Sequence, residues 1–372
     1  MHKKKKEHKK RGIGWTILRI FLGAAGILVL VLVVYIGYLF ASYHRIEDNL
    51  ELEVEKPAEG NVDETLKTGT EYSALTYNIG FGAYTPDFSF FMDGGKSSWA
   101  KSKESVLETV SGAGKLAASY DPDFALIQEV DLNSTRSYHI NEYELLKESF
   151  PEYDSVFAQN YDSAFLFYPF TQPHGRSRSG LALFSRYPVT SALRRSFPVS
   201  TSFTKFFDLD RCYSISRIPV ENGKELVIFE LHMSAYGNSD AIREGQISML
   251  CNDMKAEYEA GNYVLCGGDF NHDLKASEDD STGHESWAYP FPREDLPEHF
   301  TFCLDLLSEE EKDDLWDSAR NADMEYVPGV TYTVTLDGFI ISDNLECLSY
   351  ENINSGYSYS DHDPVYLKFK LK

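Results

Sequence analysis

The segment Leu265–Asp273 reads LCGGDFNHD and places polar residues directly after a short apolar run. That run, Asn262–Cys266 (NYVLC), has a Gly before it and two after it, a pattern typical of a buried strand. Asp269 and Asn271 stand two positions apart, so both face the same side of an extended segment. The sequence therefore predicts a strand that delivers two polar side chains to the edge of a sheet.

Polar residues end most of the other apolar runs in the same way. The runs predicted as strands are Ser73–Ile79, Phe124–Val130, Gly180–Ser185, Leu226–Leu231, Asn262–Cys266, Gly338–Ser342 and Pro364–Leu371. The polar residues at or beside their ends are Asn78, Glu129, His232, Asp269, Asn271, Asp361 and His362. One carboxylate at a strand end is usually a turn former. A set of this size, with two histidines, calls for a chemical explanation.

Two segments between the strands have helical periodicity. Apolar residues recur every three or four positions in Lys101–Ser119 and in Asp240–Ala260, which predicts two amphipathic helices. This order of elements favours sheets packed together with helices outside over a purely parallel doubly wound sheet. Phe81–Trp99 and His272–Asn321 fit neither pattern and are predicted to be long insertions near a functional rim.

The N-terminal region predicts a membrane anchor. Ile20–Ala41 holds 22 residues without a charge, about 33 Å of helix, so we expect a transmembrane helix within residues 17–42. The basic tail, residues 1–16, is expected on the cytoplasmic side. A cleaved signal peptide is the alternative, but its apolar region would be shorter and no A-x-A site follows. The charge-rich residues 43–71 are expected to form an acidic stalk below an extracytoplasmic domain, residues 72–372.

The charge balance narrows the functional classes. The chain has a net charge of −23, and residues 1–45 hold nine Lys/Arg and one acid, so the remainder carries −31. A body this acidic repels nucleic acid at long range, which argues against indiscriminate DNA binding. The five cysteines are scattered and include no CxxC pair, so neither a disulfide scaffold nor a zinc site is expected.

Six segments, taken in order, resemble the endonuclease/exonuclease/phosphatase superfamily, which contains the deoxyribonuclease I-like nucleases. They are LTYNIG, LIQEVD, ELHMSAY, LCGGDFNHD, TLDGFIIS and YSDHDPVYL, and the similarity spans about residues 72–372. The resemblance implies an α/β fold, a four-layer α/β/β/α sandwich, here preceded by one transmembrane helix. It also implies hydrolysis of a phosphoester by a metal-activated water.

The resemblance implies a metal site at Asn78 and Glu129, with Asp361 close enough to assist. The chemistry of the residues agrees, because a phosphoester is anionic and Mg²⁺ prefers one or two carboxylates while keeping waters. Mg²⁺ is therefore the expected cofactor, with Mn²⁺ as an alternative. The amide oxygen of Asn78 can complete or orient the metal shell without adding charge.

The resemblance also assigns the catalytic roles. His362 is expected to act as a general base or proton relay, oriented by Asp337. His232 is expected to donate to a phosphate oxygen. Asp269 would position or deprotonate the water, and Asn271 would bind phosphate. Both Asp269 and His362 can be written as the proton acceptor, so the identity of the base stays open.

One departure concerns the carboxylate that orients the first histidine in deoxyribonuclease I. It has no clear counterpart near GRSRSGLALFS, where Arg176 and Arg178 stand instead. These two arginines are either a phosphate or headgroup clamp or part of a solvated basic loop.

The expected activity is that of a membrane-tethered, divalent-metal-dependent phosphodiesterase acting on a lipid headgroup or a small phosphorylated substrate. A nuclease of the same fold is the alternative, and a catalytically inactive binding module is the alternative of another class. Tyr84–Trp99 and Phe165–Phe170 (FLFYPF) are either interfacial loops or packed loop cores. No protein partner is predicted.

Overall fold

The computed structural model describes residues 12–57, 64–200, 202, 209–234, 240–276 and 288–372. Most of the predicted basic tail and the end of the ELHMSAY segment lie outside these residues. Contacts divide the chain into two compact units, Met1–His44 and Arg45–Lys372.

The first unit contains one long helix, α1 (Ile13–Ser42), of 30 residues. An 18-residue window within it has a mean hydropathy of 2.8, and none of that window is buried. The helix is therefore long and apolar enough to cross a membrane.

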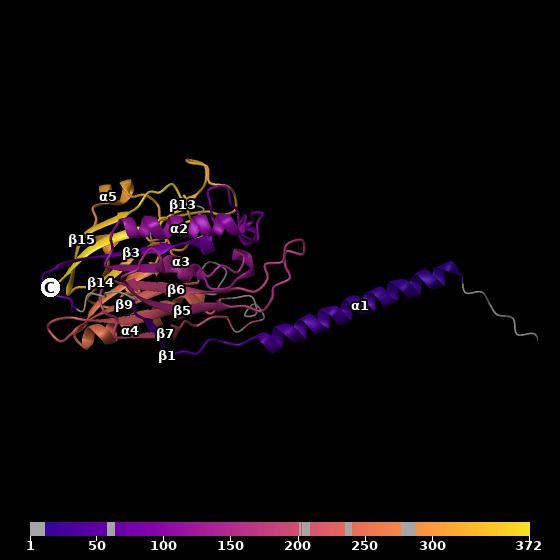
Figure 1. Cartoon of the computed structure of the whole chain (residues 1–372), viewed down its shortest axis with the longest axis horizontal. Coiled ribbons are helices and arrows are strands. Elements are labelled where there is room, and N and C mark those ends of the chain that lie inside the picture. The colour runs from indigo at the N-terminus through magenta and orange to yellow at the C-terminus, as the bar shows by residue number, and fades with distance from the viewer. Residues whose placement is uncertain (1–11, 58–63, 201, 203–208, 235–239, 277–287) are drawn as a thin grey trace, which may run out of the picture. The chain divides into compact units, whose positions relative to one another are not determined.

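The second unit is built on two seven-stranded sheets (Figure 1). The first sheet has the order β1 (Leu50–Leu52), β7 (Ser191–Ser196), β8 (Cys212–Pro219), β9 (Glu225–His232), β10 (Tyr263–Asp269), β14 (Asp337–Ser342) and β11 (Phe300–Phe302). The second has the order β15 (Leu345–Asn352), β16 (Val365–Leu371), β3 (Glu71–Asn78), β4 (Phe124–Asp131), β6 (Arg178–Ser185), β5 (Asp154–Asp162) and β2 (Val54–Glu55). A separate pair joins β12 (Ala319–Arg320) to β13 (Thr333–Val334).

The strands are apolar on both faces because each sheet is covered on both faces. In β4, Phe124 and Leu126 join the core between the sheets, whereas Ala125 and Ile127 join a second core beneath the helices α2 (Lys103–Ser119) and α3 (Glu142–Lys147). The helix α4 (Asp240–Glu259) contacts β10, and its Ile247, Leu250 and Met254 belong to the same large cluster of buried residues as Phe124 and Leu126. These layers confirm the predicted four-layer α/β/β/α sandwich.

Two parallel pairs create the edge at which polar residues gather. Strands β3 and β4 run parallel and are joined through α2, and β9 and β10 run parallel and are joined through α4. The antiparallel neighbours β6, β14 and β16 begin where these four strands end. Seven strand ends therefore meet at one side of the sandwich, which we call the polar edge.

The apolar runs correctly locate seven strands and two helices, but the predicted stalk differs from the structure. Residues from Arg45 onward belong to the second unit, and β1 and β2 pair with β7 and β5 at the margins of the two sheets. The sequence signal is LELEVE, in which Leu50, Leu52 and Val54 alternate with glutamates, as in a half-buried strand. Leu52 and Val54 pack against the core.

The two aromatic segments differ from each other. In the segment Tyr84–Trp99, the rings of Tyr84, Phe88 and Phe90 are buried. Together with the preceding Phe81 they make edge-to-face or tilted contacts, so this segment is a packed loop core. In the segment Phe165–Phe170, three of the aromatic rings are exposed.

Glu230 of β9 provides a test of the core between the sheets. It is 1% exposed and lies 3.4 Å from the amide Nε2 of Gln128 on the facing sheet, and burial raises its pKa well above the ordinary range. As pH rises, the Glu230 carboxyl group therefore loses its proton in the unfolded chain before it does so in the folded chain. The free energy of unfolding falls as pH rises above about 4.5, by up to about 1.4 kcal/mol per pH unit.

We expect Glu230→Gln to stabilise the full chain increasingly as pH rises, as measured by denaturant unfolding between pH 4 and pH 8. Glu230→Ala should cost about 2–4 kcal/mol because it leaves a cavity and an unpaired amide. Glu152→Gln, at an exposed position, is the control. An unchanged pH dependence in Glu230→Gln would contradict a protonated buried carboxyl group.

Candidate active site

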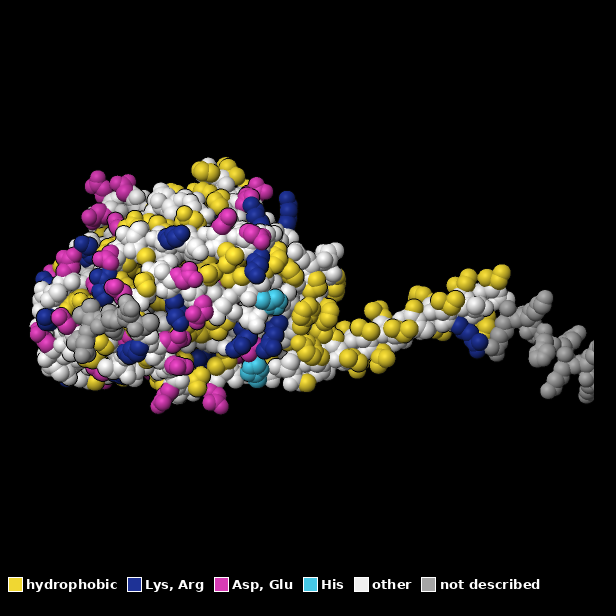
Figure 2. Space-filling view, viewed as in Figure 1, with side chains coloured by type: hydrophobic (Ala, Val, Ile, Leu, Met, Phe, Trp, Pro, Cys, Tyr) yellow, Lys and Arg dark blue, Asp and Glu magenta, His cyan; other side chains and the backbone are white. Residues whose placement is uncertain are grey.

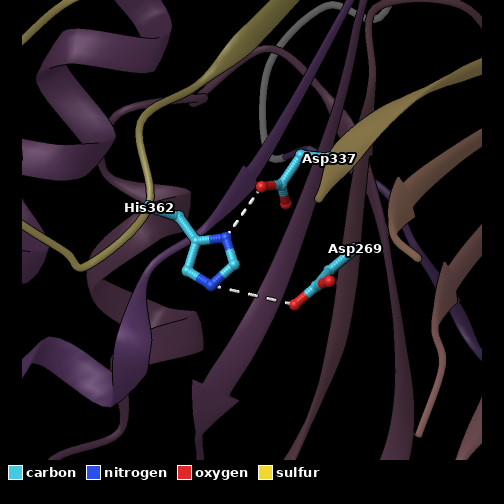
Figure 3. A group of neighbouring side chains, drawn as sticks. All are labelled: Asp269, Asp337 and His362. Carbon is cyan, nitrogen blue, oxygen red and sulfur yellow. Dashed lines mark hydrogen bonds and ion pairs between the residues drawn. The ribbon is translucent and has the colours of Figure 1, made fainter. Parts of the chain in front are cut away.

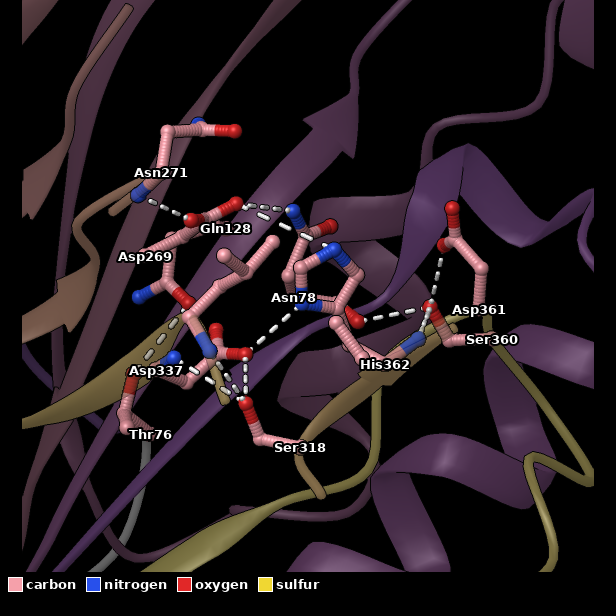
Figure 4. Close-up of polar contacts among 12 residues, drawn as sticks. Thr76, Asn78, Gln128, Asp269, Asn271, Ser318, Asp337, Ser360, Asp361 and His362 are labelled. Atoms are coloured by element: carbon pink, nitrogen blue, oxygen red, sulfur yellow. Dashed lines mark hydrogen bonds and ion pairs between the residues drawn. The ribbon is translucent and has the colours of Figure 1, made fainter. Parts of the chain in front are cut away.

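The polar edge is organised around Asp269, the last residue of β10. Because β10 lies between β9 and β14, Asp269 is paired in register with His232 on one side and with Asp337 on the other. Asn78, at the end of β3 on the facing sheet, donates from Nδ2 to Asp269 Oδ2 over 3.0 Å (Figure 4). The backbone N–H of Asn271 donates to Asp269 Oδ1 over 2.8 Å.

His362 lies between Asp337 and Asp269 (Figure 3). Its Nδ1 is 2.7 Å from Asp337 Oδ2, and its Nε2 is 3.9 Å from Asp269 Oδ2. All three side chains are buried. Burial alone would lower the pKa of His362, but the charge and hydrogen bond of Asp337, with the charge of Asp269, raise it well above the ordinary value. The contact with Asp337 therefore favours the cationic form of this imidazole.

The pKa of Asp269 is shifted toward neutrality. Burial raises it first and the negative charge of Asp337 raises it further, to about 7, against the opposing influence of His362 and two hydrogen bonds. A carboxylate with this pKa can take up or release a proton near neutral pH.

Ser318 holds Asp337 in place, and no sequence motif pointed to it. Its Oγ donates to Asp337 Oδ2 over 2.7 Å and accepts the backbone N–H groups of Leu336 and Asp337. The chain next to Ser318 also aligns the histidine segment, because Arg320 N–H donates to Asp361 O and Asp363 N–H donates to Ser318 O. The relevant signal is a long-range contact, which one sequence does not reveal.

His232 lies on the other side of Asp269, with Nε2 3.3 Å from Asp269 Oδ2. Its buried Nδ1 has no hydrogen-bond partner among the described residues. Burial, then the charges of Arg211 and His362, lower its pKa well below the ordinary value. His232 is thus a neutral imidazole, in accord with the missing carboxylate noted in the sequence.

Glu129 has an unusual backbone conformation. It sits at φ 57° within the irregularity between Ile127 and Val130, where β4 slips against β6. The side chain is half-buried, and its Oε1 lies 3.4 Å from Asn78 Nδ2. A buried strand holding a non-glycine residue in the left-handed region indicates a functional constraint.

Two groups of side chains could hold a cation. The first is the predicted set of Asn78, Glu129 and Asp361. Burial raises the pKa of Asp361 to about 6, and the charge of Glu129 contributes to that rise, so a cation between the two carboxylates would relieve their repulsion. The second is the buried group Asp269, Asp337 and His362, whose ligand atoms all lie within 4.8 Å of one another.

The arginines of the GRSRSG segment bind a neighbouring strand. Arg176 Nη2 donates to Asp162 Oδ1 over 2.9 Å, and Arg178 Nη2 donates to Gln159 Oε1 over 3.3 Å. A different arginine supports the site: Arg136 donates twice to Asp131, which ends β4, and its guanidinium lies 3.7 Å from the ring centroid of Phe81. Sequence reasoning did not single out this buried pair.

The fold and the polar edge define a phosphoester-hydrolysing enzyme. A model of the Endonuclease/Exonuclease/phosphatase family matches residues 75–302, and the chain belongs to that family. Enzymes of this family depend on divalent metal ions, and the buried Asp269, Asp337 and His362 group contains ligand types that such ions use.

Solved structures share the fold at low sequence identity. An endonuclease/exonuclease/phosphatase from Beutenbergia cavernae aligns with a TM-score of 0.54 and 13% identity, over 81% of this chain and 72% of that one. One from Bacteroides vulgatus gives 0.53 and 15%, over 82% and 100%. TDP2 of D. rerio, complexed with a single-strand DNA product, gives 0.53 and 14%, over 81% and 100%. No curated protein matches the chain.

The contact between His362 and Asp337 can be tested with an isosteric substitution. Asp337→Asn removes the charge that raises the pKa of His362, so we expect that pKa to fall in an NMR titration. Turnover of bis(p-nitrophenyl) phosphate should fall by about 10²–10⁴.

The matched control is Asp343→Asn, which alters an exposed carboxylate that also contacts a histidine, His299, over 2.7 Å. It should leave turnover unchanged. Full turnover in Asp337→Asn would show that the pair has no part in the reaction.

Proposed function

We propose that the protein is a membrane-tethered, divalent-metal-dependent phosphodiesterase acting on a lipid headgroup or a small phosphorylated substrate. The observation that carries the proposal is the position of Asp269. Its Oδ2 accepts a hydrogen bond from Asn78 Nδ2, and its side chain lies beside His232. The same carboxylate faces the imidazole of His362, which Asp337 orients.

Asn78, Glu129 and Asp361 are proposed to hold the cation. When bound, Mg²⁺ or Mn²⁺ would supply positive charge at the phosphoryl oxygens and lower the pKa of a bound water. We prefer this set to Asp269, Asp337 and His362, because the Nδ1 of that histidine and Asp337 Oδ2 already share a hydrogen bond of 2.7 Å. A metal there would have to replace that bond.

The protein's own residues then divide the proton chemistry. Asp269 is proposed to take the proton of the attacking water, since the cationic His362 has no free site to accept one. His362 faces the developing negative charge on the phosphoryl group, and neutral His232 donates one N–H to it. Asn271, held at φ 51° by a hydrogen bond from Nδ2 to Met233 O of 3.0 Å, is proposed to bind phosphate.

The charge of the chain supports a substrate other than nucleic acid. The residues after 45 carry −31, which opposes the tracking of a phosphate backbone. A nuclease of the same fold remains the second candidate, and the observation that favours it is the fold shared with TDP2, which was solved with a single-strand DNA product.

The proposed location is the cell membrane. We propose that α1 crosses it once, with residues 1–16 in the cytoplasm, because Lys and Arg dominate the flank before the helix. The catalytic domain would then be extracytoplasmic. An inactive binding module is the candidate of another class, and it is disfavoured because the metal carboxylate and both histidines are present.

The activity is tested with the full chain in detergent micelles and bis(p-nitrophenyl) phosphate. We expect release of nitrophenol with Mg²⁺ or Mn²⁺, none with chelator, and none from His362→Ala, because the imidazole that faces the developing negative charge is lost. If a folded sample releases nothing under every condition, the phosphodiesterase proposal fails and the binding module gains support.

The metal assignment predicts a separate effect for Glu129→Gln. The amide keeps the shape of the side chain but removes a ligand charge, so the Mg²⁺ concentration needed for half-maximal turnover should rise by at least about tenfold. Glu152→Gln, at an exposed position, is the control. A superimposable Mg²⁺ titration would remove Glu129 from the ligand set.

A further inference from the structure

The connection between the two units is very short. Helix α1 ends at Ser42, and the second unit begins at Arg45, so only two residues lie between them. A fully extended chain spans at most about 11 Å between the Cα atoms of Ser42 and Arg45. The covalent connection therefore allows no greater separation than this between Arg45 and the last residue of α1.

The chain enters the domain at a fixed place. Arg45 forms an ion pair with Asp210, and its Nη2 donates to Phe197 O over 3.3 Å. The next residue, Ile46, donates its N–H to Asp210 Oδ2 over 3.2 Å. Arg194 Nη1 donates to Glu47 O over 3.0 Å. These bonds attach the entering segment to the end of β7 and to the residues that precede β8.

That place belongs to the polar edge. Strand β8 begins at Cys212 and pairs antiparallel with β9, so Tyr213 is opposite Leu231, the residue before His232. Arg211 is close enough for its charge to act on His232. The tether therefore joins the domain on the side that carries the candidate active site.

Exposed apolar side chains gather on loops of the same edge. Of the eleven large apolar residues that are exposed among the described part of the second unit, seven lie on three loops: Met92 after β3; Phe167, Tyr168 and Phe170 between β5 and β6; and Met324, Val327 and Val330 between β12 and β13. The first and third loops meet where Phe90 N–H donates to Ala322 O. Scattered exposed apolar residues need no explanation, but this concentration does.

The β5–β6 loop holds its aromatic tip in an ordered hairpin. Leu166 and Gly175 exchange two backbone hydrogen bonds of 3.0 Å, and Trp99 Nε1 donates to Pro173 O over 2.7 Å. Tyr168 and Phe170 are nevertheless 63% and 85% exposed. In Figure 1 the connection between β5 and β6 projects beyond the end of the sandwich, and Figure 2 shows apolar side chains gathered at that end.

The charge of this loop differs from that of the domain. Residues 163–177 contain one arginine and no acidic residue, in a region whose net charge is −31. An acidic surface is repelled by the anionic lipids of a bilayer, whereas an aromatic tip without acids enters the interface readily. In this loop, the lack of acidic residues and the exposed aromatic rings thus favour the same contact with a bilayer interface.

We propose that the polar edge docks on the bilayer that α1 spans, with Tyr168 and Phe170 inserted into its interface. The candidate active site then opens toward the membrane surface, and phosphoesters embedded in that surface are its substrate class. The proposal rests on the membrane tether of the proposed function and extends it from location to orientation.

The test is a depth measurement on the full chain in vesicles of phosphatidylcholine with a minority of phosphatidylglycerol. Cys347→Ser removes the one partly exposed cysteine, and a nitroxide is attached to Thr171→Cys in the loop or to Glu259→Cys at the far end of α4. We expect the label at 171 to collide more with oxygen and severalfold less with a water-soluble nickel chelate than the label at 259. Equal accessibility at both positions would overturn the proposal.

A second arm identifies the side chains responsible. Tyr168→Ser with Phe170→Ser should return the label at 171 to the accessibility of water. Leu306→Ser with Leu348→Ser, which alters exposed apolar residues outside the three loops, should not. Persistent protection in the first pair would remove Tyr168 and Phe170 as the inserted residues.

Hydrolysis of bis(p-nitrophenyl) phosphate separates this proposal from the proposed function. Both pairs of variants should stay within about twofold of the unmodified chain, because neither alters a residue of the polar site. A difference in accessibility between the labels at 171 and 259, without hydrolysis, would support membrane docking and reject the phosphodiesterase. Hydrolysis with equal accessibility at both labels would support the phosphodiesterase and reject membrane docking.

Discussion

The hydrogen bond between Asp337 and His362 is the constraint on which the site depends. Two charged groups buried this deeply are unstable apart, because each loses its hydration without compensation. Here two residues compensate for the lost hydration. Ser318 donates a hydrogen bond to Asp337, and the negative charge of Asp269 stabilises the protonated imidazole of His362. The bond joins residues 25 positions apart in sequence, Asp337 at the start of β14 in the first sheet and His362 three residues before β16 of the second sheet. It can form only if both sheets are assembled in the correct register.

The register follows from two crossovers. Parallel neighbours cannot be joined by a tight turn, so β3–β4 and β9–β10 each need a helix between them. Each crossover returns the chain to the same starting side, and four strands consequently end together. The polar residues that end them are excluded from the apolar interior and meet at one edge. The sandwich thus generates a site where its strands end together, while the sequence decides which polar side chains stand at those ends.

Much of this architecture could be predicted from the sequence. Apolar runs that end in Asn78, Asp269 or His232 identify both the strands and the positions of candidate site residues, because burial and strand termination are local properties. Ser318 and Arg136 could not be identified in this way. Their partners are defined by tertiary contact, and a serine or arginine in a loop has no distinctive pattern. The strands β1 and β2 had a local signal, the alternation in LELEVE, but the density of glutamates suggested a solvated linker.

The acidity of the domain acquires a physical role once its surroundings are considered. A net charge of −31 attracts divalent cations and repels a phosphoester that diffuses freely in solution, so long-range attraction cannot supply the substrate. The proposed membrane tether would supply proximity in another way, because it would replace bimolecular encounter with a high effective concentration at the membrane surface. The groups proposed to favour an anion, His362 and a metal held by Asn78, Glu129 and Asp361, would then need to act only over the last few ångströms. In the proposed arrangement the negative surface would repel soluble phosphoesters, and the membrane would determine which phosphoester reaches Asp269.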